Sequence, residues 1–250
     1  MTESHQPRRS GFVLFFVAGW SISMVVVGGV AFLAVTGTLR QPGAASGVAA
    51  AEAVLGDSVA LAPGAGLAAL ALAQSPVWAL QLATVATAVW ARGRSWRWDL
   101  GLRFRLIDLP VGLVAGVGAQ FGIGLLYRLL EPWLDVNVEK AAEQLIARGQ
   151  GAAALVIMLL LWAVAAPVVE ELLFRGLLQG GLARLLPGPA AVALTALIFA
   201  AGHFQLVQLP GLLVAGLVFG GLAHFHGRLG PAIVAHAFFN ATTVVALARL

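Results

Sequence analysis

Ionisable side chains near residue 170 stand in an otherwise apolar stretch of sequence. Glu170 and Glu171 are adjacent, and Arg175 follows Glu171 by four residues in the segment VAAPVVEELLFR. A charged side chain deep in a lipid-embedded helix costs about 2.5–3.5 kcal/mol on insertion scales, so such residues usually face the bundle interior and carry function. An acid one helical turn before an arginine is the favourable order for an ion pair. We therefore expect a structural Glu171–Arg175 pair that leaves Glu170 free as a general acid or base.

Three more polar residues follow in equally apolar sequence. His203 is compatible with two roles: a histidine that packs in the core with a hydrogen-bond partner, or a group that transfers a proton during catalysis. His236 and Asn240 are four residues apart and share one face of a helix. Two such donors can aim at the same point, as in an oxyanion hole, or can join neighbouring helices by hydrogen bonds. Pro167, three residues before Glu170, is expected to loosen the backbone hydrogen bonds there and to kink the helix.

The composition places these residues in a membrane protein. Of the 250 residues, 60% are hydrophobic and 10% are charged, whereas a soluble domain carries about 25% charged residues. We therefore expect one integral membrane domain over residues 1–250, an all-α polytopic bundle of about seven transmembrane helices at roughly 20 residues per span. The motif-bearing catalytic core is expected at 151–249. The apolar runs that predict the spans are 11–36, 65–90, 108–130, 151–186, 189–205, 210–226 and 231–249.

Two segments between these runs have a different character. Residues 37–62 are rich in Gly, Ala, Pro and Ser and predict an extramembrane loop. Residues 136–149 mix charged and apolar side chains, which is typical of an amphipathic helix lying in the membrane interface.

The depth of the polar residues along straight helices presents one difficulty. If the runs that begin at 189 and 231 start at the same membrane face, His203 lies about 21 Å along its helix and His236 about 7 Å, at 1.5 Å per residue. Glu170 matches the depth of His203. We therefore expect either that the 227–230 turn is drawn into the protein or that the helices tilt, so that His236 reaches the site.

The charge pattern predicts topology and location. The net charge of +4 comes from arginines that cluster in loops between apolar runs, above all in 91–105, so a nucleic-acid partner is not expected, whereas membrane lipid is. The positive-inside rule places this loop and the N-terminus in the cytoplasm. The chain has no cysteine, which excludes disulfides, thiolate metal sites and a cysteine nucleophile. A composition rich in Arg, Ala and Gly is typical of a bacterial protein, so we expect a multi-pass protein of the bacterial inner (cytoplasmic) membrane.

In the order of its polar motifs the chain resembles the CPBP family (CAAX protease and bacteriocin-processing, also called Abi), which includes the type II CAAX prenyl endopeptidases. The resemblance covers residues 160–245 approximately, and its motifs are Glu-Glu-x-x-x-Arg, Phe-x-x-x-His and His-x-x-x-Asn. The residues that match these motifs are Glu170, Glu171 and Arg175, then Phe199 and His203, then His236 and Asn240.

The resemblance implies an intramembrane endopeptidase that hydrolyses a peptide bond of a membrane-associated protein or peptide. In that family the first glutamate and the second-motif histidine are taken to activate a water, a role that carries over to Glu170 and His203. The third motif is taken to stabilise the oxyanion, a role that carries over to His236 and Asn240. The residues expected to support this site are Glu171, Arg175 and Phe199.

The resemblance leaves the cofactor and two other functions open. Glu170, His203 and His236 could hold a divalent metal such as zinc, with an open position for water. The motif His-Glu-x-x-His is absent, and His236 cannot donate to an oxyanion and bind a metal through the same nitrogen, so a metal-free glutamate mechanism is equally compatible. The other functions compatible with buried polar residues are a non-catalytic membrane scaffold or immunity factor and a transporter.

Overall fold

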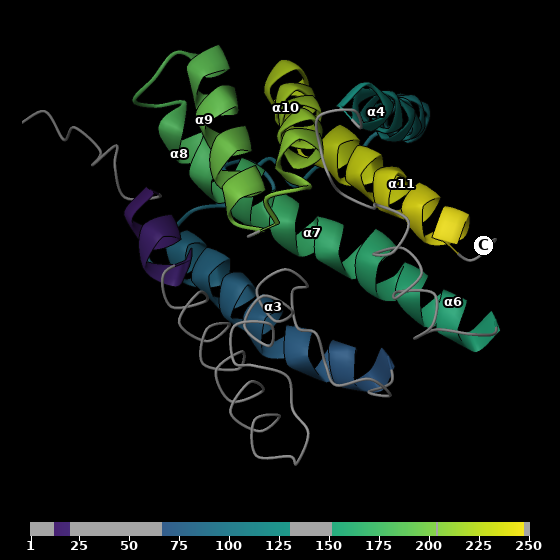
Figure 1. The fold of residues 1–250 in the computed structure, drawn as a ribbon. Helices are drawn as coiled ribbons and strands as arrows, with labels where there is room; N and C mark the ends of the chain where they lie inside the picture. The colour runs from purple at the N-terminus through teal and green to yellow at the C-terminus, as the bar shows by residue number, and fades with distance from the viewer. Residues whose placement is uncertain (1–12, 21–66, 131–151, 204, 248–250) are drawn as a thin grey trace, which may run out of the picture.

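A computed structural model describes residues 13–20, 67–130, 152–203 and 205–247, and every regular element in these ranges is a helix (Figure 1). The all-α prediction is therefore confirmed for this part of the chain. Residues 13–20 are helical. The longer helices are α3 (Leu67–Trp90), α4 (Asp108–Leu130), α9 (Gly188–Ala201), α10 (Leu209–His226) and α11 (Gly230–Leu247). The segments of the central helix are α6 (Ala152–Met158), η1 (Leu159–Ala165), α7 (Ala166–Glu171), η2 (Leu172–Gln179) and α8 (Gly180–Leu182), of which η1 and η2 are π-helical.

Three helices among the described residues are long and apolar enough to cross a membrane. They are Asp108–Leu130, Leu155–Leu182 and Leu209–His226. Two further apolar helices, Gly188–Ala201 and Gly230–Ala246, are shorter. The chain is thus an integral membrane protein, while the prediction of about seven spans, made at roughly 20 residues per span, is not confirmed by the part that the structure describes.

Several predicted segments lie partly or wholly outside the described residues. Of the first predicted span, 11–36, the structure describes only the helical residues 13–20. The predicted loop 37–62 and the predicted interfacial helix 136–149 both fall outside the described ranges.

The central helix, built from α6, η1, α7, η2 and α8, separates the remaining elements (Figure 1). Helix α3 runs along one side of it, whereas α9, α10 and α11 lie on the other side, and α4 packs on the outer face of α11. The core lies between the central helix and its neighbours. Its largest fully buried apolar side chains are Phe174, Phe199, Phe219, Leu173 and Leu177.

Proline and glycine set the ends of the helices around the site. Helices α9 and α10 both carry proline in their first turn. The N–H groups of a first turn have no acceptor within the helix, so a proline there costs no helical hydrogen bond. Helix α10 ends at His226, and Gly227 after it adopts the left-handed conformation with φ of 59°. Glycine takes this conformation without steric cost, so it stops the helix. The short turn that follows delivers the chain directly into α11.

The turn between α10 and α11 is buried beneath the loop that precedes α4. The backbone N–H of Leu229 donates to the carbonyl of Gly101 at 2.8 Å, and that of Gly230 donates to the carbonyl of Arg103 at 3.2 Å. Leu229 is only 2% exposed. The turn is therefore drawn into the protein, which is one of the two ways in which we expected His236 to reach the depth of Glu170.

An ion pair locks the same loop to the turn. The Arg228 guanidinium donates to both carboxylate oxygens of Asp108, and Asp108 is 1% exposed. The hydrogen bond to Asp108 raises the pKa of Arg228 above its usual range, so the arginine stays charged. The start of α4 and the start of α11 are thereby fixed to each other.

We expect Gly116→Ala to destabilise the contact between α4 and α11. A Cβ at Gly116 would lie 2.1 Å from the carbonyl oxygen of Ala235, a backbone atom that cannot turn away. Overpacking of this kind costs about 1–3 kcal/mol. Gly118 lies on the same helix, and a Cβ there would meet nothing within 4 Å. Thermal unfolding in detergent should therefore show a lower midpoint for Gly116→Ala and none of this loss for Gly118→Ala; equal losses would contradict this packing.

Candidate active site

The two glutamates occupy the last two positions of α7, a six-residue α-helical segment between two π-helical ones. π-Helical turns are rare in proteins, and those that do occur are frequently found at functional sites. The extra residue in such a turn changes the direction of the side chains that follow. The π-helical hydrogen-bond pattern is seen at the end of η1, where the backbone N–H of Ala166 donates to the carbonyl of Leu161, five residues earlier. Pro167 lies at the start of α7. The changed hydrogen-bond pattern expected at Pro167 is present as the π-helical segment that precedes it, whereas the expected kink stays a prediction.

Glu171 and Arg175 form the expected ion pair. The Arg175 Nη1 lies 2.8 Å from Glu171 Oε1, and both side chains are 0% exposed. Arg175 also donates through Nη2 to the carbonyl of Gly216 at 3.1 Å. Its guanidinium lies over the rings of Phe199 and Phe219, at 4.5 and 5.6 Å from their centroids. These partners offset part of the hydration that the two charges lose on burial. Glu171 Oε2 and Arg175 Nε are buried without a hydrogen-bond partner among the described residues.

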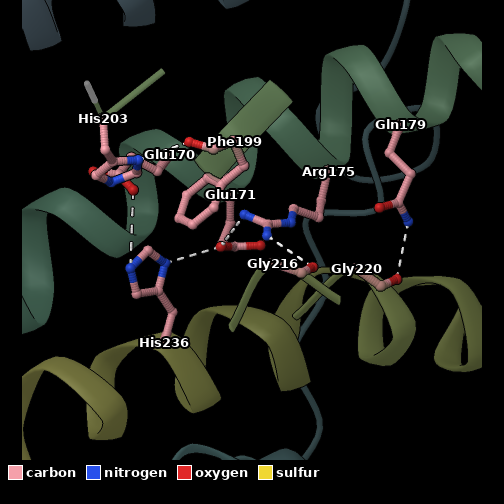
Figure 2. A network of polar contacts seen from close by, with 9 residues as sticks. All are labelled: Glu170, Glu171, Arg175, Gln179, Phe199, His203, Gly216, Gly220 and His236. Carbon is pink, nitrogen blue, oxygen red and sulfur yellow. Dashed lines mark hydrogen bonds and ion pairs between the residues drawn. The ribbon is translucent and has the colours of Figure 1, made fainter. Parts of the chain in front are cut away.

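Gln179 extends this pair into a polar ladder that sequence reasoning missed. Its Nε2 donates to the carbonyl of Gly220 at 3.0 Å, one turn beyond the Arg175 contact to Gly216 (Figure 2). A Cβ at Gly216 would meet Ala196 Cα at 3.0 Å, so glycine lets the helices approach closely. The available signal was the spacing: Gln179 lies four residues after Arg175, and the two accepting glycines are also four residues apart.

His236 contacts both glutamates. Its Nδ1 lies 2.9 Å from Glu171 Oε1, and its Nε2 lies 3.9 Å from Glu170 Oε2 (Figure 2). Because an ionised carboxylate only accepts hydrogen bonds, the Nδ1 carries a proton. Phe219 stacks on the imidazole with a centroid distance of 4.6 Å. The histidine from α11 is thus held in one orientation against the end of α7.

Glu170 differs from Glu171 in its surroundings. Its side chain is 19% exposed, whereas that of Glu171 is 0% exposed. Its one described ionic contact is the 3.9 Å approach to His236. Glu171 is therefore paired with Arg175 as expected, whereas the role of Glu170 in the chemistry stays a prediction.

His203 follows the end of α9, and its ring is fixed through one nitrogen. The Nδ1 lies 2.7 Å from the carbonyl of Phe199, which accepts, so the Nδ1 donates and the Nε2 is left for another partner. The ring of Phe199 contacts both imidazoles, with centroid distances of 4.7 Å to His203 and 6.0 Å to His236. Figure 2 draws Glu170, His203 and His236 at the same end of the polar network.

Asn240 lies one turn after His236 but contacts a different group. Its Nδ2 donates to the backbone carbonyl of Trp162 at 2.6 Å, in the π-helical segment before the glutamates. His236 and Asn240 therefore share a helix face without sharing a partner. The amide of Asn240 has a second N–H, and its predicted role at an oxyanion stays a prediction.

The three residues considered as metal ligands do not form a metal site among the described residues. No group of three or more His, Cys, Asp or Glu side chains in these ranges could hold a metal ion. The Nδ1 atoms of His203 and His236 are engaged by the Phe199 carbonyl and the Glu171 carboxylate, so the Nε2 atoms are the ring nitrogens that remain for another partner. Because the described residues bring no three such ligands together, the chemistry below uses side chains alone.

Comparison with known protein families identifies the segment that carries the polar motifs. Residues 152–242 match the family model described as Type II CAAX prenyl endopeptidase Rce1-like. The matched segment begins at α6 and contains every motif residue discussed above. No match was found among curated proteins or among solved structures.

Proposed function

The chain belongs through residues 152–242 to the family of type II CAAX prenyl endopeptidases, and from this premise we propose that Glu170 and His203 activate a water that hydrolyses a peptide bond within the membrane. The family makes the protein a CAAX-protease-type intramembrane endopeptidase acting on a membrane-associated peptide or protein. The observation that carries the mechanism is the contrast between a fully buried, paired Glu171 and a partly exposed Glu170 beside His236.

The proposed attack begins with proton transfer to Glu170. A water bound between the Glu170 carboxylate and the Nε2 of His203 loses a proton to the carboxylate as its oxygen bonds to the peptide carbonyl carbon. The His203 Nε2 accepts the second hydrogen bond of this water, since its Nδ1 donates to Phe199. General-base assistance of this kind contributes typically about 10²–10⁴-fold.

The tetrahedral intermediate needs donors for its oxyanion. The Nδ1 of His236 is held by Glu171, and its Nε2 lies 3.9 Å from Glu170 Oε2. We propose that this Nε2, when it carries a proton, is the principal donor to the oxyanion, and the second N–H of Asn240 is the predicted additional donor. The intermediate then collapses, and Glu170 returns its proton to the leaving amine nitrogen.

The setting of the reaction is the second part of the proposal. The arginine-rich loop at 91–105 faces the cytoplasm, the N-terminus lies on the same side, and the membrane is the bacterial inner membrane. We place the whole chain in one membrane domain with its catalytic core at 151–249. A peptide bond at the end of a lipid-modified or membrane-spanning segment would reach the site from this side.

The proposal predicts that His203→Ala abolishes cleavage of a reporter. The probe is an internally quenched peptide that ends in a farnesylated CAAX sequence, added to purified full-length protein in liposomes. Loss of the water-orienting imidazole should lower kcat/KM by about 10²–10⁴-fold. His224 on α10 is exposed and provides the matched control, because His224→Ala should leave the rate unchanged. Cleavage by His203→Ala at the wild-type rate would reject this role for His203.

A further inference from the structure

A backbone carbonyl in front of the active-site glutamates lacks its helical partner. In η1 the hydrogen bonds run from residue i to residue i−5, as from Ala166 to Leu161. The next bond in this register would join residue 167 to the carbonyl of Trp162. Residue 167 is proline, which has no N–H to donate. The carbonyl of Trp162 is therefore left without a donor from its own helix, and in a membrane an unpaired carbonyl is costly.

Asn240 provides that donor from another helix. Its Nδ2 lies 2.6 Å from the Trp162 carbonyl oxygen. The Trp162 side chain packs in the same region against a small buried cluster formed by Met158 of α6 and Val244 of α11. The contact between α11 and η1 thus combines apolar packing with one interhelical hydrogen bond.

We propose that Asn240 is a positioning residue, which makes the backbone hydrogen bond that Pro167 cannot make and thereby fixes the π-helical turn that presents Glu170. The bond also ties this turn to α11, the helix that carries His236. Asn240 therefore sets the relative placement of the carboxylate and the imidazole through the N–H that it gives to Trp162, whatever its second N–H does at the oxyanion. The consequence for catalysis rests on the proposed function, whereas the hydrogen-bond replacement does not.

The test is a double-mutant cycle between Asn240 and Pro167, measured by amide hydrogen exchange across residues 163–169 in the full chain. Asn240→Ala leaves the Trp162 carbonyl unpaired and should raise local exchange about tenfold. Pro167→Ala returns an N–H to the helix, so Asn240→Ala in that background should raise exchange less than about threefold. Asn240→Leu, which keeps a side chain of similar size and has no donor, should behave like Asn240→Ala.

Thr242→Val gives the matched control on α11. The Thr242 hydroxyl donates to the carbonyl of Phe238 within its own helix, so the substitution removes a comparable bond without touching η1. Its effect on exchange at 163–169 should be small and equal in both Pro167 backgrounds. An equally large effect of Asn240→Ala in both backgrounds would overturn the proposal.

Cleavage of the farnesylated reporter separates this inference from the proposed function. Asn240→Ala should lower kcat about tenfold with an unchanged KM, because the substrate still binds while Glu170 is misplaced. If the wild-type protein cleaves no reporter, the proposed function fails and the exchange cycle still decides the role of Asn240. The opposite outcome is also distinguishable. If the effects of the Asn240 and Pro167 substitutions on amide exchange simply add, while the Glu170 and His203 variants lose cleavage, the positioning role of Asn240 fails and the proposed function stands.

Discussion

Glu170→Gln is expected to lower reporter cleavage by about 10²–10⁴-fold, because it removes the group that takes the proton from water while keeping the shape of the side chain. The fold should survive. Glu170 is 19% exposed and its described ionic contact, to His236, is 3.9 Å long, so the neutral amide leaves no buried charge without a partner. The measurement is kcat/KM on the quenched farnesylated peptide, together with the unfolding midpoint of the same sample in detergent.

Glu171→Gln is the matched comparison for this prediction, since it makes the same chemical change at the adjacent residue. Glu171 is fully buried and bonds to both Arg175 and His236. The substitution at 171 should therefore lower the unfolding midpoint, whereas the substitution at 170 should not. A Glu170→Gln protein that folds normally and cleaves within a factor of about three of wild type would contradict the assignment of the general base.

Arg175→Met is expected to produce the largest loss of stability. The Glu171 carboxylate is 0% exposed, and without Arg175 it loses the guanidinium that pairs with it and keeps only the contact to His236 Nδ1. Breaking a buried pair from one side costs about 3–5 kcal/mol. The carbonyl of Gly216 on α10 also loses a donor. The measurement is the free energy of unfolding in a denaturant that acts on the protein in mixed micelles.

The corresponding double variant tells whether this cost arises from the pair. Glu171→Gln with Arg175→Met removes both charges, so it should lose less stability than the two single variants added together. The glutamine can still accept from the Nδ1 of His236 through its amide oxygen. Additive losses would show that Arg175 acts through its contacts to Phe199 and Phe219 instead of through Glu171.

The sequence predicted the parts of this site that depend on local spacing. The i, i+4 rule identified the Glu171–Arg175 pair, and the apolar run 108–130 agrees with the bounds of α4. Helix ends were less predictable. The apolar run 189–205 extends beyond α9, which ends at Ala201 before Gly202, because hydropathy does not register where a helix stops.

Contacts that depend on the tertiary arrangement could not be predicted. Straight-helix arithmetic placed His236 too shallow. The burial of residues 228–230 beneath the loop before α4 agrees with a turn that is drawn into the protein, which local sequence does not indicate. The partner of Asn240 depends on the π-helical register at Trp162, which local sequence does not specify. Gln179 could have been found from its spacing to Arg175, but an uncharged residue carries a weaker signal.

The most direct test of the mechanism is a single-turnover cleavage in water enriched in oxygen-18, with the product analysed by mass spectrometry. The wild-type protein should release a fragment whose new carboxyl terminus carries one oxygen-18 atom, and Glu170→Gln should release no such fragment in the same time. Labelled product that forms equally fast from both proteins would contradict a water activated by Glu170.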